Sequence, residues 1–322
     1  MENLNIVDLA SRTHNDQILA VTEVLAQTNQ ILTDMPMVEC NDGTGYKSVI
    51  RTGLPEVGWR KLNYGVKQGK SETKQVRDGC GMLEAWALTD EELYNLAKDK
   101  AAFLKSECDA FLERMGQEWA DAIFYGDLAE SPEKFNGLSA RYCSMSGKAP
   151  SIKNVIPAGS TVESKNTSVW LVGWSSDKVH GIYTQGSTAG IKHEDEGKKI
   201  MEDDNGGKLK MYVNHFKANV GLTVRDWRYV VRICNINTTD IKAGELMNLM
   251  VKAKNLIPNI QACKPVFYAN RDIVSALEIA YKDKSNVMLS LAEAQNGMSE
   301  LRASGIPVHI CDGLKNDEKL VK

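Results

Sequence analysis

The sequence lacks the features that mark membrane, secreted and disulfide-rich proteins. It contains no long apolar run, and it opens with Glu2 rather than with the basic segment of a signal peptide. Its seven cysteines are irregularly spaced and include no C-x-x-C pair, so we expect reduced thiols and no zinc site. These absences indicate a globular protein that does not bind membranes, and 43% hydrophobic residues agree with that class.

Recognisable catalytic motifs are also missing. There is no Walker A sequence, no G-x-G-x-x-G and no G-x-S-x-G. The acidic segment 193–204 lacks the spacing of a calcium loop, and we expect it to be a solvated loop. His180, His215 and His309 lie next to apolar residues, where packed histidines are common. An enzyme with an unrecognised site around His180, His193 and these acids stays an open alternative, but we expect no catalysis, cofactor or metal.

Charge is distributed very unevenly along the chain. The 322 residues have a net charge of −3, yet residues 46–77 carry eight positive and two negative charges, a local net charge of +6. Glycine and proline interrupt this segment, which has too few apolar residues to form its own core. We expect two strands, 46–52 and 73–86, joined by an extended tip, with the second strand bent at Gly79 and Gly81.

An acidic helix is predicted directly after this basic loop. Residues 89–125 carry nine acidic and four basic residues, a net charge of −5. Thr89 and Glu92 form a capping box, Gly126 follows the last turn, and apolar residues recur every three or four positions between them. One helix of this length would span roughly 55 Å, so we expect a structural spine.

The rest of the chain predicts a mixed α+β protein. Residues 1–38 suggest an arm, and residues 150–235 are typical of β-structure, followed by an α/β region. A strand is expected at 169–174, and a second at 181–183 that returns beside it. Further strands are expected at 209–224, 227–236, 266–268 and 306–311. Helices are expected at 16–32, 243–255, 271–281 and 289–302.

Opposite charges on loop and helix suggest that the loop lies on a neighbouring copy of the chain. The predicted subunit-interface residues are Arg51, Trp59, Arg60, Lys61, Tyr64, Lys67, Lys70, Lys74 and Arg77 on the loop, and Glu107, Glu113 and Glu118 on the helix. Trp59 and Tyr64 among cations also fit single-stranded nucleic acid, on which bases could stack. A nucleic-acid-binding protein using residues 46–77 therefore remains the alternative.

Several segments resemble the coat proteins of epsilon-type short-tailed phages. They are Val38–Tyr46, Arg51–Pro55, Trp59–Gly65, Phe124–Gly126 with Phe135–Leu138, Lys178–Tyr183 and Val220–Arg228. The match spans most of residues 38–236 and is weaker beyond 240. The order of the parts resembles tailed-phage major capsid proteins of the Hong Kong 97 type.

The resemblance implies a Hong Kong 97-type fold in five parts. These are an N-terminal arm (1–38), an extended β-hairpin loop (39–88), the spine helix with the start of the peripheral domain (89–149), a peripheral β-rich region (150–238), and an axial α/β domain with a C-terminal strand (239–322). In that fold the extended loop lies over a neighbour's spine region.

The resemblance also implies a function and partners. Subunits would form hexamers and pentamers of an icosahedral shell enclosing double-stranded phage DNA, assembled in the host cytoplasm and found in the virion. We expect noncovalent locking, because the lysine, asparagine and glutamate that cross-link some such shells cannot be placed here. A portal and a separate scaffolding protein are expected partners, since the chain begins directly at the arm, and decoration proteins are left open.

Overall fold

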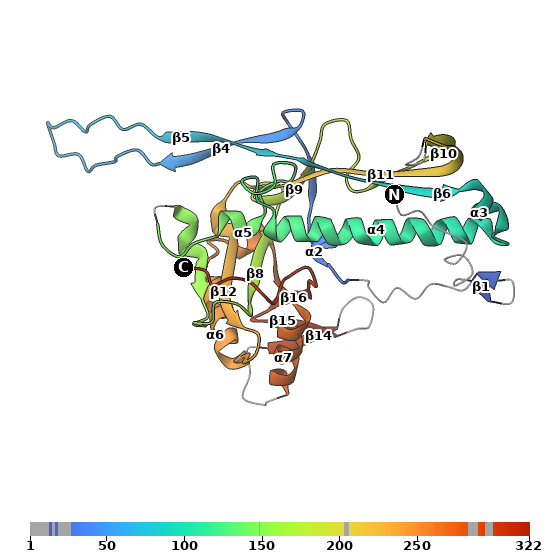
Figure 1. Ribbon diagram of the computed structural model, residues 1–322. Helices are drawn as coiled ribbons and strands as arrows, with labels where there is room; N and C mark the ends of the chain where they lie inside the picture. The colour runs from blue at the N-terminus through green and yellow to red at the C-terminus, as the bar shows by residue number, and fades with distance from the viewer. Residues whose placement is uncertain are drawn as a thin grey trace.

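The protein combines a protruding hairpin, a sheet backed by a long helix, and a second sheet flanked by two helices (Figure 1). The computed structural model describes residues 27–147, 149–202, 206–282 and 301–322 in full. It describes only the backbone of strands at 13–14, 17–18, 289–293 and 299–300. Strands β1 (Thr13–His14) and β2 (Gln17–Ile18) pair with each other.

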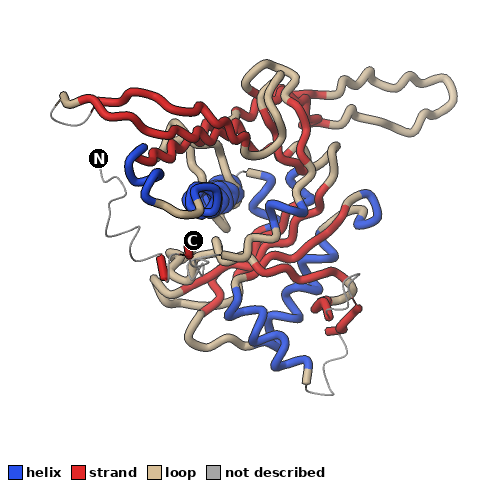
Figure 2. The backbone as a smooth tube through the Cα atoms, turned by 90° about the vertical axis from the view of Figure 1, so that its right-hand side faces the viewer, coloured by secondary structure: helices blue, strands red, loops and turns tan. Residues whose placement is uncertain are grey.

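The predicted hairpin is confirmed. Strands β4 (Gly45–Gly53) and β5 (Glu72–Gly79) form a two-stranded antiparallel sheet. The bend expected near the glycines falls at Cys80, after which β6 (Gly81–Asp90) begins. The hairpin extends away from the body in two perpendicular views (Figures 1 and 2).

A long strand, β11 (Lys208–Val224), organises the five-stranded sheet. It pairs with β10 (Lys192–Glu202) and β6 over its first part, and with β9 (Val179–Tyr183) at its end. The short strand β3 (Met37–Glu39) adds in parallel to β9. The long helix lies against this sheet and is seen nearly end-on in Figure 2.

The spine is shorter than predicted and consists of two helices, α3 (Glu91–Leu96) and α4 (Lys100–Tyr125). Thr89 caps neither of them, because it is buried within β6, whose ladder with β11 continues to Asp90. Asp90 and Asp99 provide the caps by accepting hydrogen bonds from Glu92 N and Ala102 N. The 26 residues of α4 span roughly 39 Å at the usual helical rise.

Gly126 ends α4 as predicted, but the reason is close packing rather than a left-handed backbone. Its φ of −57° is accessible to any residue. A Cβ atom on Gly126 would lie 2.4 Å from the carbonyl oxygen of Phe135 and 2.6 Å from that of Ala122. The loop after the helix can therefore fold back only over a glycine.

The second sheet has seven strands in the order β14-β15-β16-β13-β8-β12-β7. Its strands are β7 (Val155–Pro157), β8 (Asn166–Trp174), β12 (Val230–Asn237), β13 (Lys264–Ala269), β14 (Leu289–Glu293), β15 (Ser299–Ala303) and β16 (Ile306–Ile310). Every residue of β8 is buried, as its apolar run predicted. The sheet takes strands from both sides of residue 238, so the expected peripheral and axial division stays an interpretation.

Two helices of the second sheet have nearly the predicted bounds. They are α6 (Ala243–Leu256), which contacts β12 and β15, and α7 (Arg271–Tyr281), which contacts β16. The remaining helical segments are short turns: α2 (Ile31–Asp34), α5 (Leu138–Arg141), η1 (Pro150–Asn154), η2 (Trp227–Tyr229) and η3 (Ile260–Ala262). In the described part of the chain, no helix is both long and apolar enough to cross a membrane.

Two predicted helices are wrong. The helix at 289–302 is replaced by β14 and β15, because β15 pairs with β16 at the edge of the seven-stranded sheet. Most of the helix at 16–32 lies outside the described residues. Where the chain is described, Gln17–Ile18 is a strand and the only helical turn at its end is α2.

Three β predictions also need correction. Of the acidic segment expected to be a loop, residues 193–202 belong to β10, because they pair with β11 on both sides of a bulge at Glu196. The strand at 181–183 is not the return of β8, since β9 joins the other sheet. The strand predicted from Trp227 begins at Val230, after the turn η2 that Asp226 caps.

A buried ion pair connects the C-terminal segment to both the long helix and the seven-stranded sheet. Arg232 Nη2 of β12 lies 2.9 Å from Glu318 Oε2, and both side chains are almost fully buried. The other carboxylate oxygen of Glu318 accepts a hydrogen bond from Tyr125 Oη at 2.6 Å. Ser168 Oγ also donates to Glu318. Burial is tolerated because every charge has a partner.

Replacing Glu318 by alanine should destabilise the subunit strongly. Arg232 would then be a buried charge without its carboxylate, which typically costs about 3–5 kcal/mol. Urea unfolding of the unassembled subunit measures this loss. The adjacent exposed acid provides the control, since Asp317→Ala should change stability by less than about 0.5 kcal/mol. Equal effects of both substitutions would contradict a structural role for the pair.

Candidate assembly surface

The tip of the hairpin exposes an unusual number of large apolar side chains. Their exposed fractions are 80% for Leu54, 91% for Val57, 103% for Trp59, 89% for Leu62 and 71% for Tyr64. All nine loop residues that the sequence predicted as interface are exposed in the subunit. We call residues 54–71 the hairpin tip. Its apolar surface is in water here, which is typical of a surface that binds a partner.

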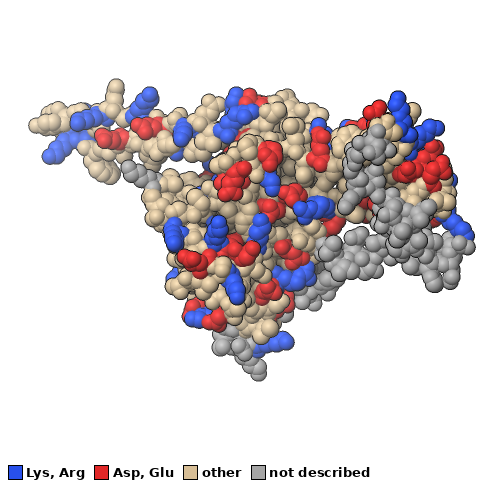
Figure 3. Space-filling view, in the orientation of Figure 1, with Lys and Arg blue, Asp and Glu red and all other residues tan. Residues whose placement is uncertain are grey.

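Lys and Arg side chains lie along the hairpin (Figure 3), and their ion pairs divide them into two groups. We call the end of the hairpin where β4 begins and β5 ends its root. There, Asp42 pairs with Lys47 at 2.7 Å and with Arg77 at 2.9 Å. Hydrogen bonds from Lys47 and then Arg77 lower the pKa of Asp42 below its ordinary value. Within the described residues, no ion pair is formed by the outer cations Arg51, Lys61, Lys67, Lys70 and Lys74. The unneutralised charge therefore lies toward the tip.

The three predicted acidic residues lie on α4, away from the hairpin of the same subunit (Figure 1). Glu118 pairs with Lys134 at 2.7 Å and Arg114 at 3.1 Å, and the bond from Lys134 lowers the pKa of Glu118. Glu113 accepts hydrogen bonds from Gln27 N and Gln117 Nε2. Glu107 is only 8% exposed. Whether any of these acids contacts a neighbour's loop stays a prediction.

A buried carboxylate that the sequence did not reveal holds the hairpin root to the body. Asp78 accepts hydrogen bonds from Arg141 Nη2 at 2.9 Å and from Thr223 Oγ1 at 2.6 Å. Arg141 also donates to the carbonyl oxygen of Leu222 at 3.1 Å. Alternation along β5 could have placed Asp78 on the inner face, but nothing in the sequence pairs it with partners so distant in the chain.

His180 lies fully buried beneath the same root. Its ring is 5.2 Å from that of Tyr46 in an edge-on arrangement. Neither ring nitrogen has a hydrogen-bond partner among the described residues. Burial, and secondly the charge of Arg225, lower the pKa of His180 from 6.5 to about 4. The packed histidine expected from its apolar neighbours is therefore a neutral one at physiological pH.

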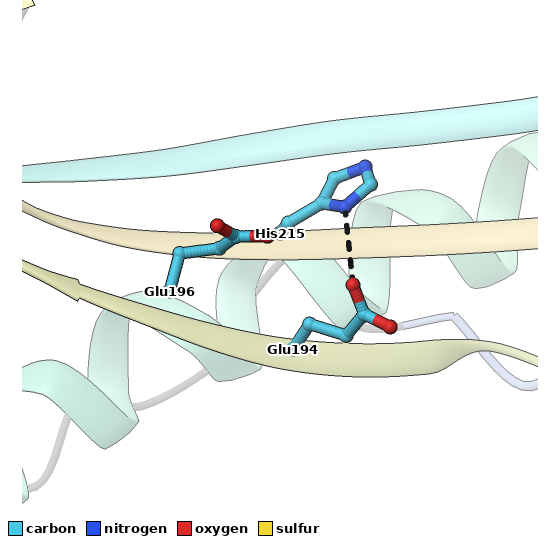
Figure 4. A group of neighbouring side chains, drawn as sticks. All are labelled: Glu194, Glu196 and His215. Carbon is cyan, nitrogen blue, oxygen red and sulfur yellow. Dashed lines mark ion pairs between the residues drawn. The ribbon is translucent and has the colours of Figure 1, made fainter. Parts of the chain in front are cut away.

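A histidine and two glutamates also meet on β10 and β11 (Figure 4). One ligand atom from each of Glu194, Glu196 and His215 lies within 4.8 Å of the others. Glu194 pairs with Lys192, and Glu196 pairs with Lys199. Because lysines already neutralise both carboxylates, we interpret the cluster as a salt-linked surface patch.

Comparison with known proteins identifies the family to which this chain belongs. The family model for the major capsid protein GP7 matches residues 13–322. The chain belongs to the major capsid protein GP7 family. Among curated proteins no significant match was found.

Two solved structures support this family membership. A chain of the bacteriophage epsilon15 structure is 29% identical, with a TM-score of 0.80, and the alignment covers 100% of this chain and 98% of that one. The bacteriophage JBD30 capsid is 8% identical, with a TM-score of 0.53 and coverage of 97% and 99%, which shows the fold alone.

These findings confirm the resemblance noted from the sequence and the Hong Kong 97-type α+β fold. The protein is a structural component of the virion that assembles with copies of itself into a capsid shell, and it is not an enzyme. The hypothesis of an unrecognised active site around His180, His193 and the nearby acids is therefore wrong.

The buried histidine should make the subunit sensitive to acid. The unfolded chain binds a proton at His180 near pH 6.5, whereas the folded chain resists it until about pH 4. Stability is therefore complete above pH 6.5 and falls by about 3 kcal/mol between pH 6.5 and 4. Urea unfolding at pH 7, 6 and 5 should show this slope, and His180→Gln should flatten it. An unchanged slope in the variant would assign the acid sensitivity to other groups.

Proposed function

We propose that this capsid protein forms the hexamers and pentamers of an icosahedral shell around double-stranded DNA, and that each hairpin tip lies on a neighbouring subunit. The observation that carries this proposal is the exposure of five large apolar side chains on a segment without a core. Large apolar side chains gathered on one exposed segment mark an interaction surface. The family's shell-forming role supplies the partner, a second copy of the same chain.

The energetics favour the tip as a binding surface. Burying apolar surface contributes about 25 cal/mol per Å², and one tryptophan or tyrosine can bury ~150–250 Å². Trp59 alone could therefore contribute several kcal/mol at an interface. Tryptophan, tyrosine and arginine are also the residues that most often dominate binding energy. A shell repeats this contact at every subunit, so a moderate contribution per contact is sufficient.

The outer cations supply orientation rather than most of the affinity. Exposed ion pairs contribute about 0.2–1 kcal/mol each. They nevertheless fix register and exclude wrong pairings, because like charges brought together are strongly unfavourable. We propose that acids on the neighbour's spine region, with Glu107, Glu113 and Glu118 as candidates, face these cations. Rearrangement of the ion pairs of Glu118 would accompany such a contact.

The geometry of the root favours a hairpin that can adopt different poses in rings of five and six. A groove of about 800 Å³ lies between the hairpin and the turn after β11, so the hairpin is not packed flat on its own body. Apart from the hydrogen bonds of Asp78 to Arg141 and Thr223, the hairpin has little support from the body, since β4 and β5 pair only with each other among the described strands. A two-stranded ribbon is pliable compared with a wider sheet.

We further propose assembly in the host cytoplasm, with a scaffolding protein and a portal as partners. All seven cysteines are free thiols, which fits a reducing compartment. The shell role supports a scaffold and a portal, because a closed container for DNA needs control of curvature and an entry point.

The exposed aromatic residues and cations of the tip also suit single-stranded nucleic acid, so binding of single strands is the alternative to binding of a neighbouring subunit.

Removing Trp59 should impair assembly while leaving the subunit intact. The side chain makes no buried contact in the subunit, so Trp59→Ala should change unfolding stability by less than about 0.5 kcal/mol. Electron microscopy should show a marked loss of closed shells when the variant is produced with its scaffold. Trp59→Phe, which keeps an aromatic anchor, should restore them. Normal shells from the alanine variant would rule out an anchoring role.

Reversing the charge at the tip tests orientation separately. The double variant Arg60→Glu with Lys61→Glu should remain soluble and folded but form no closed shells. The charge-conserving control, Arg60→Lys with Lys61→Arg, should assemble normally. Steeply salt-dependent binding of single strands by the unassembled wild-type subunit, lost in the reversed variant, would favour nucleic-acid recognition instead. Normal particles from the reversed variant would contradict the proposed charge matching.

A further inference from the structure

Two of the seven cysteines meet at the root of the hairpin. Cys40 follows β3, and Cys80 occupies the bend between β5 and β6. Their Sγ atoms are 3.4 Å apart. This is van der Waals contact, and a disulfide requires the two sulfurs to approach further, to about 2.05 Å.

Backbone contacts hold the two residues in place. Cys40 N donates a hydrogen bond to the carbonyl oxygen of Tyr183 at 2.9 Å, and Cys80 N donates to that of Thr44 at 3.1 Å. A Cβ atom on Gly221 would lie 2.6 Å from the carbonyl oxygen of Gly79 and 3.2 Å from Cys80 Cα. The absence of a side chain at Gly221 therefore lets the bend at Cys80 pack directly against β11. Together with the two backbone hydrogen bonds, this packing brings the sulfurs of Cys40 and Cys80 into contact.

We propose that Cys40 and Cys80 are an oxidation site, and that their disulfide closes residues 40–80 into a covalent ring at the base of the hairpin. The oxidant is a small disulfide such as oxidised glutathione. One cysteine thiolate attacks it, forms a mixed disulfide and releases one glutathione thiol. The second cysteine then attacks the mixed disulfide and releases the second. Two protein thiols are oxidised and one glutathione disulfide is reduced.

The chemical environment makes this oxidation slow. Burial raises the pKa of both thiols, so few thiolates are present at neutral pH. In a reducing cytosol the pair remains reduced. The bond would form in particles exposed to an oxidising medium, after the hairpin has reached its final pose. Since it joins the end of β3 to the start of β6, it would fix the direction in which the hairpin leaves the body.

The test uses the full-length chain, both unassembled and in shells, equilibrated with oxidised glutathione until the thiol content is constant. After alkylation, peptide mapping should find Cys40 linked to Cys80, with the loss of two hydrogen atoms. Trypsin cleavage at Arg60 or Lys61 should then leave two fragments that separate only after reduction. Alkylation of both cysteines at equilibrium, or linkage of either one to another cysteine, would overturn the proposal.

Variants separate the bond from its consequence. Cys40→Ser and Cys80→Ser should each release the nicked fragments without a reductant, whereas the exposed Cys143→Ser should behave like wild type. Oxidised wild-type shells should melt at a higher temperature than reduced ones, and Cys80→Ser shells should show no such difference. A linked pair with an unchanged melting temperature would overturn the stabilising role of the bond.

Discussion

The ladder between β6 and β11 is the interaction on which the rest of the arrangement depends. Ten successive residues of each strand pair, from Gly81 with Val220 to Asp90 with Met211. This pairing fixes where the chain enters the body after the hairpin and where α3 begins. Because β11 also pairs with β9 and β10, the same strand connects the hairpin root and the helical spine to the rest of the five-stranded sheet. Gly221 completes the junction by allowing Gly79 and Cys80 to approach closely.

Burial is divided sharply between the body and the hairpin. The body encloses one large apolar cluster that includes Trp170, Phe216 and Ile123. The tip adds nothing to that cluster, so its residues can be chosen for a partner without affecting folding. The root lies between the buried body and the exposed tip, and there the buried Asp78 and its two hydrogen-bond donors join the hairpin to the body. This separation is what the proposed assembly requires, in which the subunit folds before its tip binds a neighbour.

Local patterns predicted the local features well. Periodicity located α6 and α7, and the apolar run located β8, because these elements depend on their own residues and burial. Charge composition located the exposed tip. The errors arose where the secondary structure depends on pairing with a strand far away in the sequence. Thr89 has the pattern of a helix cap, but it pairs with β11 and is therefore part of a strand. Likewise, Arg141 clamps Asp78 and Cys40 meets Cys80 only because the fold brings remote segments together.

The mixture of apolar and cationic residues on the hairpin solves a problem that neither type could solve alone. Both strands of the ribbon have an open edge, and apolar residues at its tip would favour uncontrolled association. Arg51 and Lys74 on the strands, which form no ion pair among the described residues, keep like ribbons apart, since their charges would meet at close range. In the proposed assembly, opposite charge on the neighbour removes this penalty and allows the apolar contact. On this proposal the cations delay association until the correct surface is present.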